Sequence, residues 1–158
     1  MTLPGRPSGP SAKPTTILNR VLADEFVLYV KTRHAHWNVV GPEFYSLHKL
    51  FESQYEALSD VVDDVAERLR ALDAMPVGTM ADFLRLTGLQ EAKGSGGQAS
   101  ALVRDLAADH TAEAEELTAV VGLAELQEAD PGTINFLTDL VQKHQKMAWM
   151  LKATGGKS

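Results

Sequence analysis

Nine apolar residues recur at steps of three or four between Phe44 and Leu72. This spacing places them on one face of an α-helix, which has 3.6 residues per turn. A helix with one continuous apolar face gains most of its stability by packing that face against other helices. The stripe consists of Phe44, Leu47, Phe51, Tyr55, Leu58, Val62, Val65, Leu69 and Leu72. The sequence therefore predicts a long amphipathic helix inside a helical bundle.

Three further segments have helical character, at residues 16–39, 98–121 and 131–153. Gly41-Pro42 separates the first two helices, because glycine tolerates a turn and proline suits the first position of a helix. The second helix is therefore expected to begin at Pro42 and to end near Leu72. Asp130 and Pro131 supply an N-cap and a first residue for the last helix.

The link between the second and third helices is long, at residues 73–97, and includes a short helical candidate at Ala81–Leu86. Four helices with short outer links and one long middle link are typical of an all-α four-helix bundle with one crossover. In that topology the second and third helices run parallel. A chain of 158 residues fits one domain. We expect a bundle at residues 16–153 and flexible ends at 1–15 and 154–158, because the first segment is rich in Pro, Gly, Ser and Thr.

Composition excludes several classes of site. The chain has no cysteine, so disulfides, thiolate metal sites and cysteine nucleophiles are excluded, and any metal must be held by nitrogen and oxygen. A formal net charge of -6 argues against a broadly basic nucleic-acid-binding face. No apolar run approaches the roughly 20 residues that span a bilayer. We expect a soluble, cytoplasmic protein.

Four residues of metal-ligating types follow one flank of the second helix, beside the apolar stripe. His48 and Glu52 lie one turn apart, as do Asp63 and Glu67. Eleven residues separate the two pairs, which is about 16 Å along a helix. Metal–ligand bonds are only about 2 Å long, so the pairs cannot bind one ion within a straight helix. They can do so between two chains whose helices pack antiparallel about a twofold axis.

His36 adds a third ligand to the first pair. It lies eighteen residues after Leu18, which is five whole helical turns, so it faces inward and can approach His48. The predicted site combines one chain's His36, His48 and Glu52 with Asp63 and Glu67 of its partner, a ligand set suited to iron, manganese or zinc. A solvated helix flank is the alternative, and spacing alone favours it.

The stretch HWNVVGPEFYSLHKLFESQYEALSDVVDDVAER, residues 36–68, resembles the signature of the Dps family, the mini-ferritins named as DNA-binding proteins from starved cells. The shared pattern is His-Trp-Asn, then Gly, Phe and Leu-His, an acid four residues later, and Asp before Ala-Glu-Arg. The resemblance implies a ferritin-like bundle that assembles as a hollow dodecameric shell, oxidises Fe(II) with hydrogen peroxide in preference to O2, and stores the ferric mineral.

The resemblance also implies a ferroxidase site shared between two subunits. Position by position it selects His36, His48, Glu52, Asp63 and Glu67, where Glu52 replaces the Asp of many members. Trp37 is expected beside the site as an oxidant quencher, or else as a core aromatic. Iron-entry pores are expected near the last interhelical link, where the local acids are Glu125, Glu128, Asp130 and Asp139. Asp130 has the alternative role of an N-cap.

An alternative function from a different class is DNA compaction by a nucleoid-associated protein with a secondary iron site. The basic N-terminal tail, with Arg6 and Lys13, would then contact DNA. Of the remaining histidines, His110 and His144 are expected at the surface, and His34 at the surface or at an interface. No histidine follows a glutamate at Glu-x-x-His spacing, so an iron pair held within one subunit is not expected.

Overall fold

The computed structural model describes residues 13–93, 96–123 and 130–154, and these ranges contain helices and no strand. The helices are α1 (Pro14–Asn38), α2 (Phe44–Ala71), α3 (Met80–Leu86), α4 (Ala99–Val121) and α6 (Pro131–Thr154). One isolated bridge joins Val40 to Gln98. The predicted all-α four-helix bundle, with a short helix in its long connection, is confirmed.

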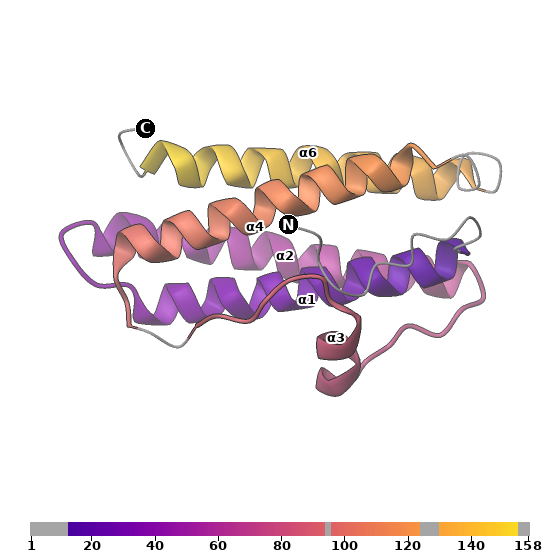
Figure 1. Cartoon of the computed structure of the whole chain (residues 1–158), viewed down its shortest axis with the longest axis horizontal. Coiled ribbons are helices and arrows are strands. Elements are labelled where there is room, and N and C mark those ends of the chain that lie inside the picture. Colours follow the sequence, from indigo (N-terminus) through magenta and orange to yellow (C-terminus); the bar gives the residue numbers. More distant parts are fainter. Residues whose placement is uncertain (1–12, 94–95, 124–129, 155–158) are drawn as a thin grey trace.

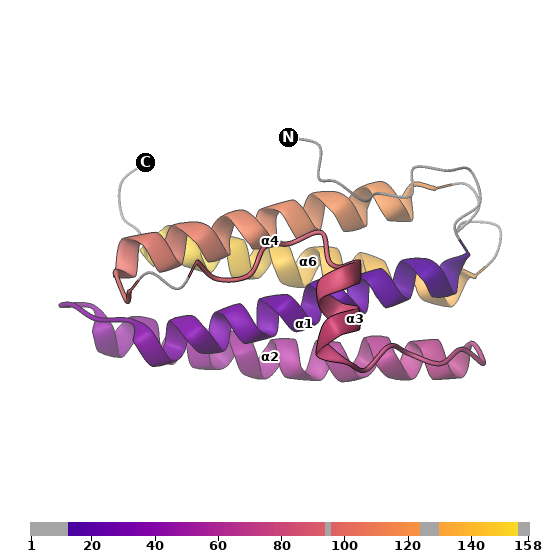
Figure 2. The same ribbon diagram turned by 60° about the horizontal axis from the view of Figure 1, so that its bottom comes forward.

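The long helices form two antiparallel hairpins, α1 with α2 and α4 with α6 (Figure 1). The helix backbones approach most closely within each hairpin, and apolar side chains of all four long helices pack together between the hairpins. The connection from α2 to α4 runs back along the bundle, and α3 lies across α1 on the way (Figure 2). As predicted, α2 and α4 are therefore parallel.

The apolar stripe of α2 supplies much of the core. Leu47, Phe51, Leu58, Val65 and Leu69 are at most 1% exposed. Phe44 begins the stripe but is 43% exposed, beyond the end of the core. Each fully buried Leu or Phe side chain contributes roughly 1.5–3 kcal/mol relative to its exposed state, so this face fixes the rotation of α2 about its axis. The opposite flank of α2 is left at the surface.

Two helix starts differ from the sequence prediction. The first helix begins at Pro14 rather than near Thr16, because the proline itself takes an early helical position. The second begins at Phe44 rather than at Pro42, because Gly41, with φ +118°, and Pro42 form the turn before it. Leu47 N–H then donates to the carbonyl of Glu43 in the first turn of α2.

A close backbone contact holds the α1–α2 turn against the start of α4. The N–H of Val40 donates to the carbonyl of Gly97 at 2.9 Å. A Cβ atom at Gly97 would lie 1.6 Å from the carbonyl oxygen of Asn38, so only glycine fits there. This contact fixes the end of α1 that carries His36.

At the other end of the bundle, Arg68 joins α2 to the start of α6. Its Nη2 donates to both oxygens of Asp130, at 2.9 and 2.7 Å, and its Nε donates to Thr133. Asp130 also accepts from the N–H groups of Gly132 and Thr133, so its predicted N-cap role is confirmed. Partial burial acts to raise the pKa of Asp130, but the hydrogen bonds from Thr133 and Arg68 hold it below its usual value.

Candidate metal site

His36 of α1 and His48 of α2 face each other across the tight turn. Their rings stack with centroids 3.7 Å apart and an interplanar angle of 17°. Nδ1 of His36 lies 2.8 Å from the carbonyl oxygen of His48, and Nδ1 of His48 lies 2.8 Å from the carbonyl oxygen of His36. The two side chains are thus held by a reciprocal pair of hydrogen bonds.

These bonds fix the tautomer of both rings. A carbonyl oxygen only accepts, so each Nδ1 carries the proton and donates it. In the neutral ring Nε2 then keeps its lone pair, the form in which histidine binds metals. Both Nε2 atoms are therefore ready to act as ligands, as the predicted roles of His36 and His48 require.

Aromatic side chains surround the histidine pair. Phe44 stacks on His48 with ring centroids 5.0 Å apart, and Tyr55 meets His36 edge-on at 5.1 Å. The Arg33 guanidinium lies 4.4 Å from the centroid of the Tyr55 ring and 5.2 Å from that of Trp37. These contacts limit the motion of the two imidazoles.

Glu52 lies one turn beyond His48 and is engaged by a lysine. Nζ of Lys49 lies 2.7 Å from Oε2 of Glu52, in a partly exposed ion pair. The hydrogen bond from Lys49 lowers the pKa of Glu52, and the charges of Lys49, His36 and His48 act in the same direction. Glu52 is therefore an anion held by a cation that a bound metal would have to displace.

We expect Lys49→Met to strengthen metal binding at this site by at most about fivefold, because an exposed ion pair contributes no more than about 1 kcal/mol. The change removes the ammonium group that competes for the Glu52 carboxylate. Anaerobic calorimetric titration with Fe(II) measures it. Lys146→Met is the matched control, because it removes one positive charge from an exposed position on α6. Unchanged or weaker binding in Lys49→Met would show that the ion pair does not compete with the metal.

Asp63 and Glu67 are exposed on α2 and make no hydrogen bond or ion pair with another described residue. Their separation from Glu52, about 16 Å along the helix, excludes a joint site within one chain. Within the described ranges, no three His, Asp or Glu side chains are grouped so as to hold a metal ion. A site on His36, His48 and Glu52 must therefore take further ligands from outside the protomer.

Trp37 is 64% exposed, next to Arg33. The alternative interpretation of Trp37 as a core aromatic is therefore wrong for the protomer. Its role as an oxidant quencher stays a prediction.

The remaining predicted contacts lie at the surface or outside the described residues. Asp139 is exposed on α6, and Lys13 is exposed at the N-cap of α1. Glu125, Glu128 and Arg6 lie outside the described residues. The pore and DNA roles of all five residues stay predictions.

The expected surface positions of His110 and His144 are wrong, because they are 0% and 1% exposed. They lie at the centre of the bundle with Glu25 and Glu113, which the sequence interpretation passed over. A helical signal was present: His110 lies four residues after Leu106 and seven before Leu117, both core residues. His34 is half-buried and lines a pocket beside α4. Its position is closer to the predicted surface location than those of His110 and His144.

The fold is that of a ferritin-like protein. A family model described as a ferritin-like domain matches residues 15–157. No helix in the described part of the chain is long and apolar enough to cross a membrane.

Relatives define the family more closely. The DNA protection during starvation protein of Helicobacter pylori is 33% identical over 87% of this chain and 94% of its own length. A low temperature-induced protein of Nostoc is 42% identical over 87% of this chain and 76% of its own. Dps from Thermosynechococcus elongatus superposes with a TM-score of 0.86 at 32% identity, over 92% of this chain and 91% of its own. The chain belongs to the Dps family.

Proposed function

We propose that the protein is a ferroxidase and iron-storage mini-ferritin. The observation that carries this proposal is the reciprocal hydrogen bonding of His36 and His48, which leaves both Nε2 atoms free beside the Glu52 carboxylate. A solved relative, the Dps protein of Vibrio cholerae, is described as a ferritin-like diiron-carboxylate protein, which supports iron as the metal. It is 30% identical, with a TM-score of 0.82, over 89% of this chain and 87% of its own. Zinc and manganese would fit the same ligands.

The second half of the site comes from a twofold partner. The partner subunit's Asp63 and the partner subunit's Glu67 supply the missing carboxylates, and the interface repeats the arrangement twice. The exposure of Asp63 and Glu67, and their lack of described partners, support this arrangement. Twelve subunits then enclose a hollow shell.

The reaction consumes iron and peroxide together. Two Fe(II) ions each lose one electron, and hydrogen peroxide takes both electrons and breaks its O–O bond to give two hydroxide ions. Carboxylate oxygens are hard ligands and favour Fe(III) over Fe(II), so the site favours oxidation. We propose hydrogen peroxide as the preferred oxidant and O2 as the slower one. Removing both Fe(II) and peroxide protects DNA and the rest of the cell from hydroxyl radical.

DNA compaction through the N-terminal tail is the alternative function. The names of the relatives speak of DNA protection, which oxidation of iron also provides without DNA binding. The tail offers only Arg6 and Lys13 before α1, in a chain with a net charge of -6. We therefore place iron oxidation first.

The test is whether oxidised iron stays with the protein. After anaerobic addition of Fe(II) followed by peroxide, we expect iron to co-elute with a species of about twelve subunits in size-exclusion chromatography with light scattering. The same addition without protein should give a precipitate. A monomeric protein that elutes without iron would overturn the proposal.

A further inference from the structure

Four ionisable side chains meet in the middle of the bundle, far from the proposed ferroxidase site. Glu25 comes from α1, His110 and Glu113 from α4, and His144 from α6, and none is more than 2% exposed. We call them the central cluster. It lies between the two hairpins, within the core that their apolar side chains share. The cluster is thus a main polar connection between the hairpins.

A chain of hydrogen bonds crosses from one hairpin to the other. Nε2 of His144 lies 2.7 Å from Oε1 of Glu25, and Nδ1 of His144 lies 2.9 Å from Nδ1 of His110. The carboxylate accepts from Nε2–H of His144, whose Nδ1 lone pair then accepts from Nδ1–H of His110. This assignment leaves both rings neutral. Nε2 of His110 then carries a buried lone pair without a hydrogen-bond partner.

The cluster contains more acceptors than donors. Oε2 of Glu25 and Oε1 of Glu113 are also buried without a hydrogen-bond partner. A buried carboxylate is costly unless it is neutralised. The described residues include no group of three ligands placed to hold a metal. Protons on the cluster and the nearby cation of Arg20, which acts on Glu113, therefore balance its charge.

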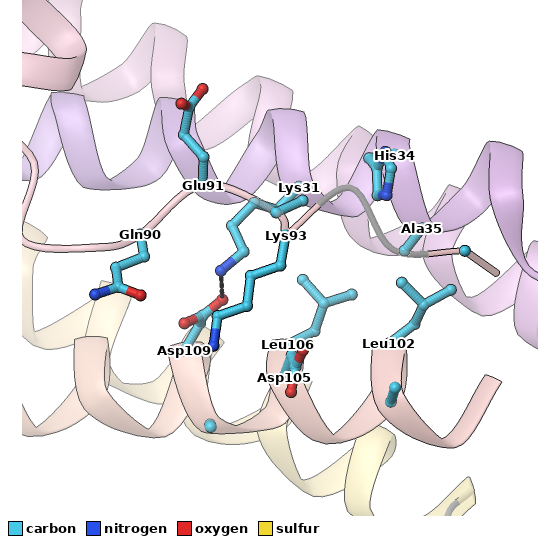
Figure 3. A pocket seen from close by; sticks show the side chains of 14 residues that line it. Lys31, His34, Ala35, Gln90, Glu91, Lys93, Leu102, Asp105, Leu106 and Asp109 are labelled. Atoms are coloured by element: carbon cyan, nitrogen blue, oxygen red, sulfur yellow. Dashed lines mark ion pairs between the residues drawn. The ribbon is translucent and has the colours of Figure 1, made fainter. Parts of the chain in front are cut away.

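Charged groups on the packed helices surround it. On α1, Arg20 acts on Glu113, and Asp24 accepts hydrogen bonds from Thr87 and from the N–H of Gly88. Lys31 of α1 pairs with Asp109 of α4 (Figure 3). The charge of Lys31 also acts on His110. From α2 the neighbouring buried polar group is the uncharged Gln54, which donates to the Met147 carbonyl of α6.

Burial sets the protonation of both α4 residues. It lowers the pKa of His110 to about 3, and the electrostatic interactions with His144 and Lys31 act in the same direction. Burial also raises the pKa of Glu113 well above its usual value, and Asp24 and Glu25 act in the same direction. Burial raises the pKa values of Asp24 and Asp109 as well.

We propose that the central cluster is a proton-sensitive junction that holds the α1–α2 and α4–α6 hairpins together while His110 is neutral and Glu113 is protonated. A second proton on His110 would go to Nε2, which is buried without an acceptor, and would leave an unpaired positive charge in the core. Loss of the Glu113 proton would add a second buried carboxylate beside Glu25. Either change weakens the contact between the hairpins.

The contributions of His110 and Glu113 to folding stability change with pH in opposite directions. Below its ordinary value of 6.5, unfolded His110 binds a proton that the folded protein excludes, so its contribution is lost as the pH falls toward about 3. Above its ordinary value of 4.5, unfolded Glu113 has lost a proton that the folded protein keeps, so its contribution is lost as the pH rises. Each effect changes the unfolding equilibrium constant about tenfold per pH unit.

Urea unfolding of the full-length protein tests the junction. Circular dichroism follows wild type, His110→Gln, Glu113→Gln and the control His34→Gln between pH 3.5 and 8, and light scattering follows the assembly. The ratio of wild-type to His110→Gln unfolding constants should rise about tenfold per pH unit as the pH falls below 6.5. The corresponding ratio for Glu113→Gln should rise as the pH increases above 4.5. His34→Gln should run parallel to wild type.

Two results would overturn the proposal. One is an unfolding constant for His110→Gln or Glu113→Gln that changes with pH in parallel with that of wild type. If one of the two variants does not fold, the other alone decides the test. The other is a loss of stability on adding EDTA to His36→Ala/His48→Ala. That variant lacks the proposed iron ligands, so the loss would show that a metal balances the central cluster.

Discussion

Replacing both His36 and His48 with alanine should reduce the initial rate of Fe(II) oxidation by hydrogen peroxide at least about 100-fold. Removing a residue that only holds a metal ligand in place already lowers metal affinity or activity by up to about 100-fold. Here the ligands themselves are removed. The two residues also hold each other in place through their backbone carbonyls. A single replacement should therefore disturb both.

The rate is followed by stopped-flow absorbance of the ferric product under anaerobic conditions. His34→Ala is the matched control, because His34 lies on the same helix, two residues from His36, and outside the site. Circular dichroism checks that the bundle is intact. Rates equal to wild type in the double variant would rule out this histidine pair as the iron site.

Mixing two inactive variants should restore about one quarter of wild-type activity. One variant is His36→Ala/His48→Ala, which keeps its carboxylate half-site. The other is Asp63→Asn/Glu67→Gln, which keeps its histidine half-site. In a mixed dimer one of the two sites receives both intact halves, and the other receives both altered halves. Random pairing makes half of the dimers mixed, so about one quarter of all sites is complete.

The mixture is prepared by unfolding and refolding the two variants together, and the oxidation rate is compared with that of each variant refolded alone. Wild type taken through the same procedure gives the reference rate. Asn and Gln keep the size of the carboxylate side chains, so loss of packing does not explain inactivity. A mixture as inactive as its components would show that the five residues do not form a site shared between two subunits.

The elements of the bundle were predictable because they depend on local patterns. The apolar stripe of α2, the Gly-Pro turn and the Asp130-Pro131 start each act within a few residues along the chain. Errors were confined to helix ends, as at Pro42, where the positive φ of Gly41 extends the turn by two residues. The parallel course of α2 and α4 followed from the length of the connection between them.

The candidate site was predictable in part. Helical phase placed His36 near His48, and the structure brings them together. Phase did not predict their reciprocal hydrogen bonds, because these depend on how closely the turn brings two carbonyl groups to the opposing rings. Nor did it predict the Lys49–Glu52 ion pair, which is one of several contacts open to an exposed lysine.

The central cluster was missed because polar residues on a helix are usually assigned to its solvated face. Glu25, His110 and His144 lie 85 and 34 positions apart along the chain, and each is accommodated in the core only by the others. By itself the sequence determined the helices and the crossover, since helical period and the lengths of the links decide both, and it predicted that His48 and Glu52 lie too far along α2 from Asp63 and Glu67 to share one ion within a chain. Only the tertiary structure decided which nitrogen atoms are free and which charges are buried, because those depend on side chains that meet from different helices.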